Sequence, residues 1–187
     1  MMTVNAIRLT TDRLLLRELW PNDWQVVLAY QSKPEYLRYY AWEQRSKHDV
    51  QKFVQEFISW QDERPRSKFQ FATALPGEQK LIGLCGLRMP SVDAYEGELG
   101  YEIDPGYWGR GFATEAVRAL LAFGFNEQKL HRIWAWCLSE NSASVRVLEK
   151  TGLQFEGRLR ENKFFKGRWW DTLIYSILER EWAAGLT

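Results

Sequence analysis

The sequence predicts an α+β fold with one mixed, mostly antiparallel sheet of about seven strands and helices on both faces. Short apolar runs and helical repeats follow one another in the order β-α-α-β-β-β-α-β-α-β-β. A helical segment separates the strands expected at 98–103 and 133–138, so these two strands can run parallel. The length of 187 residues suits one sizeable core, and we expect a single domain over residues 1–187.

The N-terminal half begins with a strand and two helices. Residues 13–17 are an apolar run with charged ends, and a helix is expected to follow with Asn22 or Asp23 as its cap. Ser46 and Asp49 approximate a capping box before a second helix, which carries apolar residues along one face. Three strand runs then predict an antiparallel meander at 69–75, 81–87 and 98–103.

The C-terminal half alternates helices and strands. A long helix is expected at 113–128, a strand at 133–138, and a short helix at 142–150 that stops at Gly152. A final hairpin follows, with strands at 155–160 and 169–178 and the pair Lys166-Gly167 as the turn signal.

Composition limits the classes of function. The formal net charge of +1 gives no overall attraction to nucleic acid or to an acidic membrane, so we expect neither a DNA nor a membrane partner. Cys85 and Cys137 lie in apolar, strand-like runs and are expected to be buried free thiols. The cysteines and the two histidines are widely scattered, which predicts no metal site. The start of the chain shows no signal-peptide pattern and no run is long enough to span a bilayer, so we expect a cytoplasmic protein.

The segment 107–116 is the most informative stretch of the chain. Gly109 and Gly111 lie between a predicted strand and a predicted helix, where free first-turn amides and the helix dipole favour an anion. No Lys-Ser or Lys-Thr follows Gly111, so the motif G-x-x-x-x-G-K-[ST] is absent. Thr114 stands at the third glycine of G-x-G-x-x-G. The segment alone indicates either a phosphate-binding turn or a tight connector.

Motifs spread over nearly the whole chain resemble the GNAT superfamily of acyl-CoA-dependent N-acetyltransferases. Within that superfamily, the chain resembles the Rim-type subfamily of ribosomal-protein alanine N-acetyltransferases. The motifs are, in order, LTTDRLLLR at 9–17, ELGY at 98–101, WGRGFATEA at 108–116, NSAS at 141–144, EKTGL at 149–153 and KGRWWD at 166–171.

The resemblance implies acetyl-CoA as cosubstrate, with its pyrophosphate on the backbone of the glycine loop. The pantetheine arm is expected between the strands 98–103 and 133–138, which splay apart in the family and offer backbone groups to it. The residues assigned to the cofactor in this way are Tyr101, Ile103, Trp108, Gly109, Arg110, Gly111, Phe112, Ala113, Thr114, Asn141 and Ser144. Trp108 departs from the family pattern, which has Gln or Arg there. Arg110 is either a phosphate contact or a solvated loop charge, and Asn141 is also a good helix cap.

Amine acetylation needs a neutral amine, a polarised thioester carbonyl and a stabilised thiolate. Glu98 and Glu102 share one face of their strand, so either can take the amine proton. Glu98 is the first choice because it matches the acidic residue before Gly-Tyr in the subfamily, and Glu161 in the final hairpin is a third candidate. Leu148 replaces the tyrosine that many family members carry. Ser144 matches the serine of the Rim-type pattern and is the candidate donor to the thiolate, with water as the alternative proton source. The alternatives are surface or ion-paired carboxylates and a serine that only fills space.

The acceptor amine stays open at this stage. The leading interpretation is a protein or peptide N-terminal α-amine, with a ribosome-associated substrate. The alternatives are a small amine such as a polyamine, amino acid or antibiotic, a non-catalytic acyl-CoA-binding protein, and an RNA-associated protein. Aromatic residues expected to line an acceptor site are Trp20, Trp42, Phe164, Phe165, Trp169 and Trp170. Basic residues interleave with the last four, which also suits a solvated hairpin face. The sequence leaves monomer or homodimer open.

Overall fold

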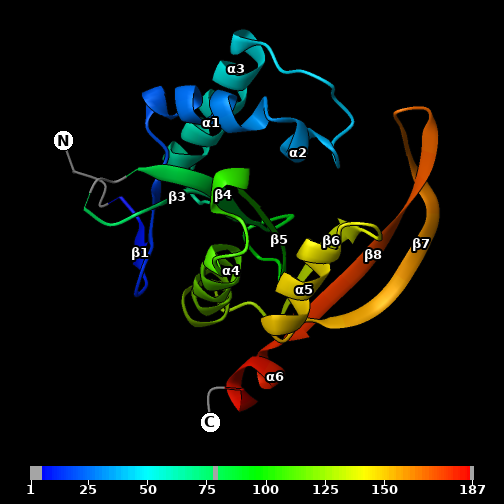
Figure 1. The fold of residues 1–187 in the computed structure, drawn as a ribbon. Coiled ribbons are helices and arrows are strands. Elements are labelled where there is room, and N and C mark those ends of the chain that lie inside the picture. The colour runs from blue at the N-terminus through cyan, green and yellow to red at the C-terminus, as the bar shows by residue number, and fades with distance from the viewer. Residues whose placement is uncertain (1–5, 78–79, 186–187) are drawn as a thin grey trace.

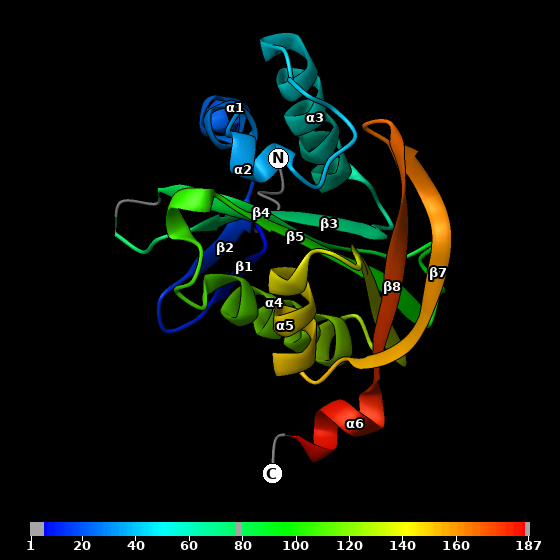
Figure 2. The same cartoon turned by 45° about the vertical axis from the view of Figure 1, so that its right-hand side comes forward.

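One eight-stranded sheet runs through the protein, and helices pack on both of its faces (Figures 1 and 2). The structure is a computed structural model and describes residues 6–77 and 80–185. The strand order is β1-β2-β3-β4-β5-β6-β8-β7, and the described strands pair antiparallel except for β5 with β6. The mixed, mostly antiparallel sheet is therefore confirmed, with one strand more than the sequence predicts.

The strands are β1 (Arg8–Thr10), β2 (Leu15–Glu18), β3 (Lys68–Ala74), β4 (Leu81–Arg88), β5 (Glu96–Ile103), β6 (Arg132–Leu138), β7 (Gln154–Phe165) and β8 (Arg168–Leu178). The α-helices are α1 (Trp24–Gln31), α2 (Pro34–Leu37), α3 (Lys47–Ser59), α4 (Phe112–Ala122), α5 (Ser142–Lys150) and α6 (Glu179–Ala184). Among the described helices, none is long and apolar enough to cross a membrane.

Three short elements escape the sequence pattern. Strand β1, helix α2 and helix α6 have three, four and six residues, which is too short for a periodic signal to stand out. The first predicted strand also begins later than expected, at Leu15 rather than at Arg13. The reason is that Arg13 leaves the sheet to contact α4, an interaction that no local pattern reveals.

The long helix expected at 113–128 changes its winding. It is α-helical only as far as Ala122 and continues as a π-helical turn, Phe123–Glu127. Phe123 and Phe125 are both buried, with Phe123 against Phe69 and Phe71 and with Phe125 against Trp182. Gly124 lies between them, where an added Cβ would come within 2.5 Å of Ile133. Close packing therefore fixes this turn.

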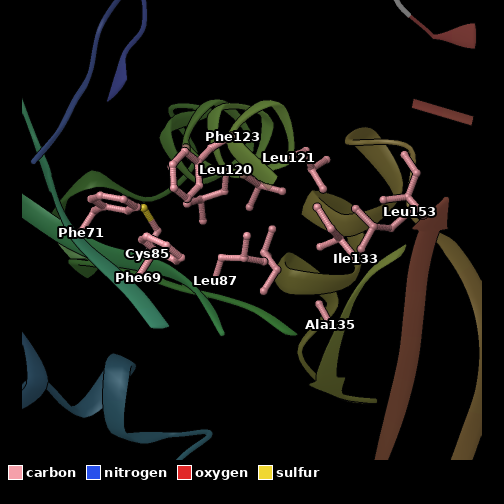
Figure 3. Close-up of a cluster of buried hydrophobic side chains, with 14 of the residues drawn as sticks. Phe69, Phe71, Cys85, Leu87, Leu120, Leu121, Phe123, Ile133, Ala135 and Leu153 are labelled. Carbon is pink, nitrogen blue, oxygen red and sulfur yellow. The ribbon is translucent and has the colours of Figure 1, made fainter. Parts of the chain in front are cut away.

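The sheet separates two hydrophobic cores. Helices α4 and α5 cover one face, where Leu87, Leu120 and Ile133 belong to the larger cluster (Figure 3). Helices α1, α2 and α3 cover the other face, where Val27 and Val54 pack on the sheet (Figure 2). We call these the α4–α5 face and the α1–α3 face. Because side chains alternate along a strand, β3 and β4 contribute to both cores, with Phe71 and Cys85 on the α4–α5 face and Ala72 and Leu84 on the α1–α3 face.

Several local predictions are confirmed. Ser46 caps α3 with the expected capping box, and Gly152 ends α5 with a φ of 88°. Lys166 and Gly167 both have positive φ, 52° and 72°, as a two-residue hairpin turn requires. Both cysteines are free and buried.

The final hairpin is longer than the sequence predicts, because β7 extends to Phe165. Its turn reaches the segment after α2, where the Lys166 Nζ donates to the Leu37 carbonyl at 2.7 Å. The rings of Tyr39 and Trp170 also meet edge to face, with centroids 6.5 Å apart. The hairpin is therefore tied to the helices of the α1–α3 face.

Candidate functional site: a glycine loop beside two diverging strands

The glycine loop leads from β5 to the N-terminus of α4. Gly109 and Gly111 have φ of 75° and 81°, a left-handed conformation that glycine adopts without strain. Gly111 is the N-cap of α4, and the amide of Glu115 donates the first helical hydrogen bond to its carbonyl, at 3.0 Å. The amides before Glu115 therefore have no helical partner. The loop has the geometry of an anion site at a helix N-terminus.

Two residues near the chain start hold this loop, and both belong to the LTTDRLLLR motif at 9–17. Glu115 accepts from the Thr11 hydroxyl at 2.5 Å and pairs with the guanidinium of Arg13. Arg13 Nη1 also donates to the carbonyl of Arg110 at 3.0 Å. Burial raises the pKa of Glu115, but the hydrogen bonds and charge of Thr11 and Arg13 outweigh burial and hold the pKa below its usual value. The loop is thus fixed through α4 to the β1–β2 connection.

Strands β5 and β6 pair only at their beginnings. The three pairs are Glu96 with Arg132, Gly97 with Ile133 and Glu98 with Trp134. Beyond these pairs, the described part of β5 is held by β4 and that of β6 by β8. The two strands therefore diverge toward the glycine loop, as the sequence comparison with the superfamily implies.

The backbone of β5 turns free groups toward this divergence. The amide of Asp104 donates to the Ile82 carbonyl at 2.7 Å, so Gly83 and Ile103 form a non-hydrogen-bonded pair. Pair types alternate, so Tyr101 and Ile103 both direct their N–H and C=O groups away from β4 and toward the side of β6. Such an edge can pair with an extended amide-bearing chain.

Trp108 lies across the end of this edge. Its indole Nε1 donates to the Ile103 carbonyl at 2.7 Å, while the ring is 48% exposed. A carbonyl oxygen has two lone pairs, so Ile103 retains one acceptor position. Trp108 thus orders the β5 end rather than offering a polar group to a phosphate.

A hydroxyl cluster lies beside the divergence, on the α4–α5 face. Asn141 caps α5 by accepting from the Ser144 amide at 3.1 Å, which leaves the NH₂ of Asn141 as a donor. The Tyr101 hydroxyl lies 2.7 Å from Ser144 Oγ and 3.2 Å from the Ser144 carbonyl. Burial raises the pKa of the Cys137 thiol to about 11, against a hydrogen bond with Ser144 that lowers it. Strand β5 and helix α5 are therefore bridged by one hydroxyl pair.

Glu102 on the α1–α3 face is surrounded by donors. Its Oε1 accepts from the Tyr30 hydroxyl at 2.5 Å and from Gln31 Nε2 at 2.8 Å. Its Oε2 accepts from Tyr36 at 2.6 Å, and the hydroxyl of Tyr40 lies 3.5 Å away. A carboxylate has about four acceptor positions, so Glu102 is close to saturated. Burial is the main cause that raises the pKa of Tyr30 and Tyr36, so these phenols stay protonated donors.

Glu98 differs from Glu102 although both point to the same face. Glu98 Oε1 accepts a hydrogen bond from an indole, Trp136 Nε1, at 3.1 Å. Trp136 is 43% exposed, and the Lys163 ammonium lies 5.2 Å from its ring centroid. Glu98 therefore keeps open acceptor positions at the point where β5 and β6 diverge.

Comparison with known proteins identifies the family. An acetyltransferase (GNAT) domain matches residues 13–154. The chain belongs to the GNAT acetyltransferase family. An uncharacterised N-acetyltransferase of Bacillus subtilis, YnaD, is 34% identical over 94% of this chain and 99% of that protein. The ribosomal protein uS5-alanine N-acetyltransferase of Escherichia coli is 26% identical over 97% of this chain and 96% of that protein.

Solved structures agree with this assignment. A GNAT acetyltransferase from Bacillus anthracis has a TM-score of 0.81 and 32% identity, over 93% of this chain and 99% of that one. A spermidine N-acetyltransferase from Vibrio cholerae, solved with CoA and spermine, has a TM-score of 0.79 over 92% of this chain and 99% of that one. Its 24% identity shows a shared fold alone. The chain is an acetyl-CoA-dependent N-acetyltransferase of GNAT type.

The GNAT assignment makes two departures in this chain informative. Trp108 stands where Gln or Arg is usual, and its indole serves the backbone of β5 instead. Leu148 stands where many members have tyrosine, and it is fully buried in the core of the α4–α5 face. Glu161 lies exposed in an irregular part of β7, with a φ of 50° and its amide bonded to Asp171. Glu98 and Glu102 therefore lie on β5 near its divergence from β6, whereas residue 148 provides no hydroxyl there.

The basic residues of the hairpin mostly have partners. Arg158 pairs with Asp171, and Arg168 pairs with Glu140. Lys166 binds the α2 segment as described above. These three basic side chains therefore have partners within the protein. The sequence alone also allows them to form part of a nucleic-acid-binding surface.

Replacing Gly111 is expected to weaken acetyl-CoA binding. Valine at a φ of 81° is strained, and its Cβ would stand 3.4 Å from the Arg13 guanidinium. We expect Gly111→Val to raise the dissociation constant of CoA by about tenfold in calorimetric titration. Gly77→Val is the matched control, because Gly77 has a φ of 86° but lies in the β3–β4 connection. Equal affinity in wild type and Gly111→Val would contradict the loop assignment.

The Glu115 contacts predict an acid-sensitive stability. Because the folded pKa of Glu115 is depressed, its contribution is complete above the unfolded pKa and is lost as pH falls through the folded pKa. The difference in free energy of unfolding between wild type and Glu115→Gln should therefore be largest above about pH 5 and shrink in more acidic buffer. Urea denaturation across this range measures it. The exposed Glu56→Gln serves as control, and a pH-independent difference would refute the prediction.

Proposed function

We propose that this GNAT enzyme transfers acetyl from acetyl-CoA to the α-amine of a protein or peptide N-terminus. The observation that supports it most is the unequal state of the two carboxylates on the α1–α3 face. Glu102 accepts hydrogen bonds from several neutral donors, whereas Glu98 accepts one from the partly exposed indole of Trp136. A single carboxylate with free acceptor positions beside an aromatic ring suits a substrate with one amine, such as the N-terminus of a mostly uncharged peptide.

A polyamine fits this surface less well. A polyamine carries several ammonium groups, and each is stabilised by a carboxylate that is not already paired. Glu102 is close to saturated, and Asp171 and Glu140 already hold Arg158 and Arg168. The relative that is named a ribosomal protein uS5-alanine N-acetyltransferase supports the peptide interpretation. The spermidine enzyme among the solved structures keeps the polyamine as the competing acceptor.

The proposed chemistry is direct attack of the amine on the thioester. Glu98 accepts the proton that the amine nitrogen loses, either directly or through a water molecule. The carbonyl carbon forms the new C–N bond, and the C–S bond breaks with its electron pair on sulfur. The Ser144 hydroxyl donates a hydrogen bond to the departing thiolate. Asn141 and the edge of β5 hold the pantetheine arm in this scheme.

The acceptor is tested by release of free CoA thiol with a matched panel of amines. The panel holds peptides that begin with alanine, the same peptides with a blocked N-terminus, spermidine, and single amino acids. We expect turnover with the free peptides and none with the blocked ones. Faster turnover with spermidine than with any peptide would overturn the proposal in favour of a polyamine acceptor. Absence of turnover with every amine would favour an acyl-CoA-binding protein.

The two carboxylates are separated by matched substitutions. Glu98→Gln should lower kcat by roughly 100-fold with little change in KM for acetyl-CoA, because a general base is lost. Glu102→Gln should lower kcat less than Glu98→Gln does. Its main effect should be a lower free energy of unfolding, since it disturbs the hydrogen bonds of the tyrosines of α1 and α2. Steady-state kinetics and urea denaturation of both variants distinguish the roles. Equal kcat values for wild type and Glu98→Gln would remove Glu98 as the base.

A further inference from the structure

The leaving group of the reaction needs a donor that this chain does not supply in the usual way. When the C–S bond breaks, the electron pair stays on sulfur, and a nearby hydroxyl stabilises the thiolate. Leu148 has no hydroxyl and is fully buried. Ser144 is the serine of α5 that lies beside Tyr101, but an isolated serine hydroxyl rotates freely and need not point at sulfur.

The structure fixes Ser144 from two sides. Its amide donates to Asn141 Oδ1 at 3.1 Å, which sets the first turn of α5. Its Oγ lies 2.7 Å from the hydroxyl of Tyr101, a residue that reaches across from β5. Of the two acceptors offered to the phenol, Oγ is nearer than the Ser144 carbonyl at 3.2 Å. If the phenol donates to Oγ, the proton of Ser144 is directed away from Tyr101, to the side where the Cys137 thiol is also a neighbour.

Tyr101 is suited to remain a donor. Burial raises the pKa of its phenol above the usual value, against the lowering effect of the hydrogen bond with Ser144. The phenol therefore keeps its proton throughout the pH range of enzymatic activity. Tyr101 also belongs to the part of β5 that diverges from β6, so its side chain lies beside the place expected for the pantetheine arm.

We propose that the Tyr101 side chain is a positioning residue, which donates to Ser144 Oγ and thereby directs the Ser144 proton to the CoA sulfur. The two hydroxyls form a chain in which each donation strengthens the next. This inference rests on the donor role proposed above for Ser144 and adds the side chain of Tyr101, beyond the backbone role that the family resemblance implies.

The scheme balances without a further reactant. The amine nitrogen forms a bond to the acetyl carbon and loses one proton, which Glu98 passes to solvent. The sulfur keeps the electron pair of the broken C–S bond and leaves as a thiolate that accepts the Ser144 hydrogen bond. Tyr101 and Ser144 both end the cycle protonated, since neither gives up its proton.

The test uses CoA itself and needs no acceptor. In the complex of the full chain with CoA, the ultraviolet absorbance of the thiolate reports the pKa of the bound thiol. We expect Tyr101→Phe and Ser144→Ala each to lower the acid dissociation constant of the bound thiol by about tenfold, because the thiolate loses a hydrogen bond. The dissociation constant of CoA itself should be nearly unchanged. The double variant should show no larger shift than Ser144→Ala, because Tyr101 acts through Ser144. Ser144→Thr, which keeps a hydroxyl, should restore most of the effect.

The control is Tyr175→Phe. Tyr175 is also a buried tyrosine beside α5, with its hydroxyl 3.5 Å from Glu149, but it lies on β8. Tyr175→Phe should therefore leave the pKa of the bound CoA thiol as it is in wild type. If Ser144→Ala shifts the pKa of the bound thiol and Tyr101→Phe does not, the role of Tyr101 is overturned while that of Ser144 stands. If neither variant shifts it, both roles fail, and the choice of acceptor amine is unaffected.

Discussion

The short parallel ladder between β5 and β6 is the constraint on which the rest of the site depends. It ends at Glu98 and Trp134, after three pairs. Each strand is still held on its other side, β5 by β4 and β6 by β8, so the two can part without loss of their remaining hydrogen bonds. The separation exposes backbone groups of Tyr101 and Ile103 and brings the start of α5 next to β5.

Alternation along β5 divides the chemistry between the two faces of the sheet. Tyr101 points to the α4–α5 face, where it meets Ser144, and Glu98 and Glu102 point to the α1–α3 face. The cofactor side and the acceptor side thus share one strand but not one environment. Glu102 serves as an anchor for the tyrosines of α1 and α2, and this leaves Glu98 as the carboxylate with capacity to accept a proton.

Predictions from sequence succeed where local physics decides. The capping box at Ser46 and the turn at Lys166-Gly167 depend on residues within a few positions of one another, and both are confirmed. They fail where packing at a distance decides. In the π-helical turn Phe123 and Phe125 are buried and Gly124 lies against Ile133, a distant neighbour that the helical pattern does not contain.

The sequence by itself determined the order of the longer elements, the place of the glycine loop, and the resemblance that points to acetyl-CoA. The resemblance favoured Glu98 over Glu102, but residue spacing could not separate them, because both occupy equivalent places on one strand face. Only the tertiary structure showed that the two carboxylates have different hydrogen-bond partners, since the donors to Glu102 come from helices about 70 residues away in the chain. The pairing of Tyr101 with Ser144 arose in the same way. How many hydrogen bonds a carboxylate or hydroxyl receives depends on long-range contacts, and residue spacing carries no record of them.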